Sequence, residues 1–126
     1  MSIKVVDKGF GNVLNIPDDA RGNVLITIEG DNNVITIVNL RRVDNLKITV
    51  DGDGGMIQMD PFRIGNLSIG IKHGAKVVIG KGTSIEGAYI LSDHGRVVSI
   101  GDDCMFSYNV QIRTTDSHGI YDVLNS

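Results

Sequence analysis

The residues of this chain best suited to chemistry lie together near its C-terminal end, in the segment Asp116-Ser117-His118. An imidazole titrates close to neutral pH, so His118 could take or give a proton under physiological conditions. The flanking serine and glycine fit an ordinary exposed loop histidine equally well. Whether His118 has a chemical role depends on the elements that position its side chain.

The other reactive side chains predict structural roles. His73 and His94 are each followed by glycine, which is typical of a turn. Cys104 falls on a small, inward position of the repeat described below, so we expect it in the core. A single cysteine excludes an internal disulfide framework and a cysteine-rich zinc site. Without a spaced cluster of histidines and carboxylates along the sequence, we expect no metal.

Composition excludes several classes of partner. The net charge of −3 offers no basic stripe, so we expect no nucleic-acid partner. No apolar run approaches the roughly 18 residues of a transmembrane segment, and the N-terminus lacks the pattern of a signal peptide. Together with the lone cysteine, these features predict a cytoplasmic protein.

Short apolar runs with a period of two recur along the chain, each bounded by Gly, Asn or Asp. Runs of this length and period predict strands rather than helices. The clearest cover residues 24–28, 34–37, 46–50, 67–71 and 76–79. The chain is therefore expected to be all-β.

The later strands repeat one another. Large apolar residues recur every six positions in two triplets that are 21 residues apart: Ile79, Ile85 and Leu91, then Ile100, Phe106 and Ile112. Three hexapeptides make one coil of a solenoid, with a three-residue excursion placed near 93–95. The spacing predicts that Ile79 stacks on Ile100, Ile85 on Phe106 and Leu91 on Ile112.

Each hexapeptide has a physical rationale. Its first residue points inward, and the next lies at a corner where Gly80 and Gly101 would allow positive φ. The fifth position points inward but must be small, as Thr83, Cys104 and Val110 are.

We expect a single β-helix domain over residues 1–126. Residues 1–60 are interpreted as irregular capping coils, 61–112 as regular coils and 113–126 as an active-site loop. A separate small β domain at 1–60 is the alternative.

Two motifs carry a resemblance to a known family. They are Ile-Gly-x-Asp-Cys-Met at 100–105 and Arg-x-Thr-Asp-x-His-x-Ile at 113–120. With them the chain resembles the hexapeptide-repeat acyltransferases, and in particular the bacterial O-acetyltransferases that modify capsular and other surface polysaccharides. The resemblance implies a left-handed parallel β-helix, acetyl-CoA as co-substrate, and a sugar hydroxyl of a glycan as acceptor. It also implies a homotrimer with active sites between neighbouring subunits.

The same resemblance assigns roles to residues. His118 corresponds to the general base that takes the hydroxyl proton, and Asp116 could orient its ring or balance its charge. Tyr108 and Arg113 are candidates for the acceptor side, where Arg113 could hold a sugar carboxylate by two hydrogen bonds.

The chain departs from the family in two respects. Gly119 stands where relatives usually have proline, and relatives continue through several more coils, so the sequence looks like the N-terminal part of such an enzyme. The competing hypothesis is a non-catalytic β-helix, either a remnant or a bactofilin-like assembly protein.

Overall fold

The computed structural model describes residues 2–114 and 120–123, and within them the secondary structure consists of strands only. The strands are β1 (Ser2–Asp7), β2 (Val13–Asn15), β3 (Asn23–Glu29), β4 (Val34–Ile37), β5 (Val43–Asp51), β6 (Met56–Met59), β7 (Arg63–Lys72), β8 (Lys76–Ile79), β9 (Ser84–Ser92), β10 (Val97–Ile100), β11 (Met105–Phe106), β12 (Val110–Arg113) and β13 (Ile120–Val123). The described residues contain no helix long and apolar enough to cross a membrane.

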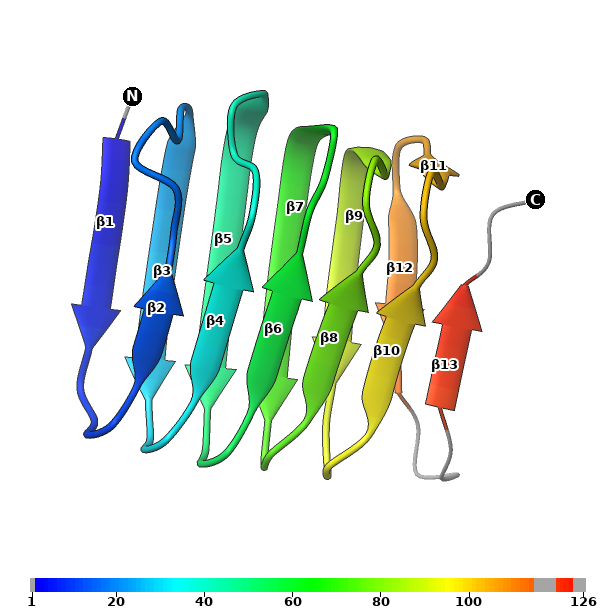
Figure 1. The fold of residues 1–126 in the computed structure, drawn as a ribbon. Coiled ribbons are helices and arrows are strands. Elements are labelled where there is room, and N and C mark those ends of the chain that lie inside the picture. The colour runs from blue at the N-terminus through cyan, green and yellow to red at the C-terminus, as the bar shows by residue number, and fades with distance from the viewer. Residues whose placement is uncertain (1, 115–119, 124–126) are drawn as a thin grey trace.

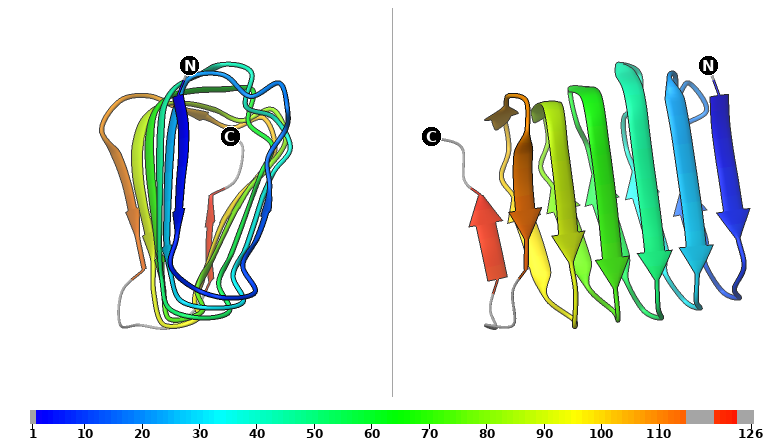
Figure 2. Two further views of the ribbon diagram at one scale, coloured as in Figure 1. Left: turned by 90° about the vertical axis from the view of Figure 1, so that its left-hand side faces the viewer. Right: turned by 180° about the vertical axis from the view of Figure 1, so that it is seen from behind.

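The strands form two parallel sheets through which the chain passes in turn (Figure 1). One sheet has the order β1-β3-β5-β7-β9-β11, with β12 also paired to β9, and the other has the order β13-β10-β8-β6-β4-β2. Seen from the N-terminal end in Figure 2, left, the chain descends on the left, rises on the right and recedes from the viewer. This path is left-handed, so the predicted left-handed parallel β-helix is confirmed.

Alternation of apolar and polar residues places the core between the two sheets. In β5, Leu46, Ile48 and Val50 are buried, whereas Lys47 and Thr49 are exposed. Ile48 pairs with Ile69 in the next coil, so the inward side chains stack along the axis. Each such aliphatic side chain contributes roughly 1.5–3 kcal/mol when it leaves water. A single coil cannot bury its apolar side chains alone, so its stability depends on the neighbouring coils.

The register confirms two of the three predicted stacks and corrects the third. Ile79 pairs with Ile100 and Ile85 pairs with Phe106. Leu91, however, pairs with Arg113, because Ile112 lies beside Ile90. The segment 107–109 between β11 and β12 has one residue more than its counterpart at 86–87, so the offset grows from 21 to 22 residues.

The corner glycines also differ from expectation. Positive φ occurs at Gly82 (78°) and Asp103 (54°), not at Gly80 or Gly101. Gly80 is needed for another reason, because a Cβ there would lie 2.6 Å from the carbonyl oxygen of Gly101 in the next coil. The small inward positions are confirmed, with Thr83 and Cys104 buried. Val110 is partly buried against the same core.

The first coils belong to the same two sheets as the later ones. Their spacing drifts: Ser2 pairs with Asn23, Asn23 with Asn45, and Met56 with Lys76, which are offsets of 21, 22 and 20 residues. This drift explains why the N-terminal half shows no clear phase in the sequence. The capping role proposed for residues 1–60 stays a prediction.

Candidate functional site

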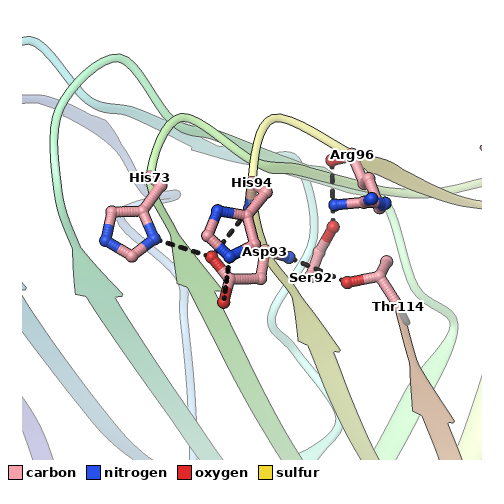
Figure 3. Close-up of polar contacts among 6 residues, drawn as sticks. All are labelled: His73, Ser92, Asp93, His94, Arg96 and Thr114. Atoms are coloured by element: carbon pink, nitrogen blue, oxygen red, sulfur yellow. Dashed lines mark hydrogen bonds and ion pairs between the residues drawn. The ribbon is translucent and has the colours of Figure 1, made fainter. Parts of the chain in front are cut away.

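Thr114 is the last described residue before the predicted catalytic segment, and two hydrogen bonds fix its position. Its backbone N–H donates to the carbonyl oxygen of Leu91 (3.0 Å), and its Oγ1 accepts from the backbone N–H of Asp93 (3.0 Å). The chain that leads into the segment is therefore anchored to the turn between β9 and β10 (Figure 3). Asp116 and His118 themselves lie outside the described residues, so their roles stay predictions.

Arg113 lies at the end of β12 with its side chain exposed. Its guanidinium carbon is 5.4 Å from the centroid of the Tyr89 ring, within the range of a cation–π interaction. The one-residue shift in register puts Arg113 beside Leu91 on the outer face of the sheet. A guanidinium held there can offer paired N–H donors to a carboxylate.

Tyr108 lies in the segment that carries the extra residue, and its side chain is 69% exposed. The following residue, Asn109, takes up the insertion with a φ of 64°, a conformation that asparagine tolerates. Tyr108 borders a surface groove that crosses three coils and is lined mainly by polar groups, including Asn66, Ser68, Tyr89 and Gln111.

Tyr89 joins the two predicted acceptor residues, and sequence reasoning missed it. Its ring contacts Arg113 and also lines the groove beside Tyr108. Tyr89 pairs with Gln111 in the next coil and points outward from β9. An aromatic residue at an outward position one repeat before the motif was the signal that could have found it.

Arg63 stands beside this region at the start of β7. It forms ion pairs with Glu86 (3.1 Å) and Asp44 (3.5 Å) on the two adjacent strands. The hydrogen bond and charge of Glu86, followed by the charge of Asp44, raise the pKa of Arg63 above its ordinary value. Arg63 therefore remains cationic, and its charge is satisfied mainly by its own neighbours.

The turns after β7 and β9 bring His73, Asp93 and His94 together, as Figure 3 shows. Both histidines are turn residues as predicted, each with a φ of 52°. Their rings stack with centroids 5.1 Å apart and an angle of 10° between the planes. Sequence reasoning missed this cluster, although the histidines are separated by 21 residues, the period of the repeat.

The carboxylate of Asp93 faces one ring nitrogen of each histidine. His73 Nδ1 is 2.8 Å from Asp93 Oδ1, and His94 Nε2 is 3.7 Å from Oδ2. Partial burial raises the pKa of Asp93, but the hydrogen bonds from the His73 side chain and the His94 backbone, with the charges of both histidines, leave it below its ordinary value. Asp93 is therefore a carboxylate at neutral pH.

Two known proteins resemble this chain, one in sequence and one in both sequence and fold. No family model matches the chain. A polysialic acid O-acetyltransferase of Neisseria meningitidis is 28% identical over 122 residues, which cover 94% of this chain and 56% of that protein. The crystal structure of the polySia-specific acetyltransferase NeuO aligns with a TM-score of 0.73 and 28% identity, over 93% of this chain and 55% of that one.

The predicted resemblance is confirmed. The likeness to these two acetyltransferases covers nearly all of the chain, in sequence as well as in fold. The chain spans a little over half the length of each relative. That share agrees with the expectation that it corresponds to the N-terminal part of such a protein.

Proposed function

We propose that this chain is part of an acetyl-CoA-dependent O-acetyltransferase that modifies a sugar hydroxyl of a surface polysaccharide. The observation that carries the proposal is the joint likeness in sequence and fold to acetyltransferases of polysialic acid, at 28% identity over nearly the whole chain. The cytoplasmic location and the homotrimer predicted from the sequence are parts of the same proposal.

The proposed mechanism assigns the proton transfer to His118. A sugar hydroxyl is a poor nucleophile at neutral pH, so a base must take its proton as the oxygen attacks the thioester carbon. The tetrahedral intermediate then collapses, with the thiolate of coenzyme A as leaving group. Asp116, two residues earlier, would orient the imidazole or balance the charge that it gains.

The described residues support an acceptor side on the outer face of β9 and β12. The rings of Tyr89 and Tyr108 offer flat surfaces for sugar rings, and the groove between them is lined by amides and hydroxyls. Arg113, held over Tyr89, could bind the carboxylate of an acidic sugar. Replacing Arg113 with lysine would keep the charge but lose the planar pair of donors.

The test is acetyl transfer by the complete gene product, with acetyl-CoA as the donor and sialic-acid oligomers as the first acceptors. We expect His118→Ala to lower the rate by about 10²–10⁴-fold, the usual contribution of a positioned general base. Asp116→Asn should cost less, and adding it to His118→Ala should cost almost nothing further, because the two residues act as a unit.

Binding of acetyl-CoA, measured by calorimetry, is the control for His118→Ala. It should be unchanged, since the histidine acts on the acceptor hydroxyl. A fully active His118→Ala protein would overturn the assignment of the base. Filaments without transfer to any glycan would favour the non-catalytic β-helix instead.

A further inference from the structure

His73 and His94 occupy equivalent places in two consecutive turns of the β-helix. Each follows a long strand of the same sheet, β7 or β9, and each adopts the left-handed backbone conformation with a φ of 52°. Because the two turns have the same shape and lie one coil apart, the imidazole rings are brought into a stack. The fold itself, rather than a local sequence motif, creates the pair.

Asp93 completes a set of three donor groups. One donor atom from each residue, a ring nitrogen of each histidine and a carboxylate oxygen, can be chosen so that all three lie within 4.8 Å of one another. The two histidine side chains are each 61% exposed and the Asp93 side chain is 28% exposed. The group therefore opens to solvent on one side and rests on the protein on the other.

The surroundings hold Asp93 in place. Its Oδ1 accepts a hydrogen bond from the backbone N–H of His94 (2.7 Å), and its own backbone N–H donates to Thr114 Oγ1 (3.0 Å). Outer contacts of this kind fix the orientation of a metal ligand and typically change affinity by about 10–100-fold when removed. The carboxylate thus has a defined direction, toward both imidazoles (Figure 3).

We propose that His73, Asp93 and His94 form a binding site for a divalent transition-metal ion of the Zn²⁺ class. Imidazole nitrogen with carboxylate oxygen is a donor set that suits Zn²⁺ and its neighbours rather than Mg²⁺ or Ca²⁺. Tetrahedral bonds of about 2.0–2.1 Å place ligands roughly 3.3 Å apart. The donor atoms lie within 4.8 Å of one another. Because an imidazole lone pair lies in the plane of its ring, binding would turn at least one of the two exposed rings out of the stack.

The ion would replace the direct contact between His73 and Asp93 and link the turn after β7 to the turn after β9. Solvent molecules would fill the remaining coordination positions on the exposed side. The expectation of no metal rested on the lack of a spaced cluster in the sequence; the fold gathers one from residues 20 and 21 positions apart. The three donor groups define this site without reference to the proposed transferase function, although Thr114 ties the turn of Asp93 to the chain that leads into the proposed catalytic segment.

Calorimetric titration of the chelator-treated chain with Zn²⁺ tests the site. We expect about one ion per chain, bound through three protein ligands with solvent at the remaining position. His73→Asn and His94→Asn are the informative variants, because asparagine accepts the left-handed backbone of the turn but removes the imidazole. Each should weaken Zn²⁺ binding by at least about tenfold, and the double variant should abolish it.

The third histidine of the chain supplies the matched control. His118→Asn removes the third imidazole of the sequence, and we expect it to change Zn²⁺ affinity less than either turn variant. Thermal unfolding without metal confirms that each variant is folded. The proposal is overturned if the folded double variant binds Zn²⁺ as tightly as the unsubstituted chain, if the latter binds none, or if only His118→Asn abolishes binding.

Discussion

Gly80 shows that a glycine can be required by a close backbone approach alone. Its φ is not positive, yet a Cβ at this position would meet the carbonyl group of Gly101 at 2.6 Å. Gly54 presents the opposite case, with a φ of 71° and no atom within 4 Å of the added Cβ. The hexapeptide pattern identified the right residue at position 80 but assigned it the wrong reason.

These two glycines predict different effects of substitution. Gly80→Ala should lower the free energy of unfolding by about 1–3 kcal/mol, because two coils must move apart to admit the methyl group. Gly54→Asn, the control, should cost less than about 1 kcal/mol, since asparagine adopts positive φ in open space. Urea denaturation of both variants gives the comparison, and equal losses would contradict it.

Ile100 provides a second test at the scale of single residues. It is 1% exposed and pairs with Ile79 in the preceding coil. Ile100→Asp would bury a carboxylate without a partner, at a cost of at least several kcal/mol. Ser99→Asp, on the other face of the same strand, should lower the thermal midpoint far less. An unchanged midpoint for Ile100→Asp would show that this register is wrong.

At the scale of elements, side chains in the turns join the coils in addition to the strands. Asn33 is 1% exposed, and its Nδ2 donates to Asn12 Oδ1 (3.1 Å) and to the carbonyl oxygen of Gly52 (2.9 Å). Its Oδ1 accepts from the backbone N–H of Gly55 (2.8 Å). One buried amide therefore links three consecutive turns.

Removal of that amide predicts a large loss of stability. Asn33→Ala leaves the buried N–H of Gly55 and the carbonyl of Gly52 without this partner, and each unsatisfied group costs about 1–3 kcal/mol. Asn45→Ala is the control, because Asn45 is exposed, donates one bond to Asn66 (3.0 Å) and accepts a long one from Asn23 (3.5 Å). It should cost under about 1 kcal/mol. Similar losses of unfolding free energy for the two variants would refute this role of Asn33.

The sequence predicts elements better than it predicts where extra residues enter. Period-two runs located the strands, and the spacing of 21 residues located the stacks as far as Phe106. Phe106 and Ile112 keep their spacing of six, so nothing in the pattern reveals the extra residue between them. Only the pairing of Ile112 with Ile90 reveals it, because the inward side chains on either side of the insertion, Phe106 and Ile112, stay packed in the core.

Across the whole molecule, contacts between coils explain which parts of the candidate site were predictable. Arg113 and Tyr108 belong to a motif that is continuous in the sequence. Tyr89 contacts Arg113, and His73 contacts Asp93, only because the coils stack on one another. A search of outward positions at the repeat period could have found both groups, since equivalent residues of adjacent coils are always close in a parallel β-helix.

Assembly is the remaining prediction at this scale. The resemblance implies a homotrimer, and the described surface exposes large apolar side chains, Phe10 at 83% and Met105 at 85%, that contact with other copies would shield. Sedimentation equilibrium of the chain should give three times its 13.6 kDa, about 41 kDa. The open edge of a parallel sheet also favours association at high concentration. Dilution should therefore reveal dissociation of the trimer. A single monomeric species at high micromolar concentration would contradict the trimer, and with it the proposal that active sites lie between subunits.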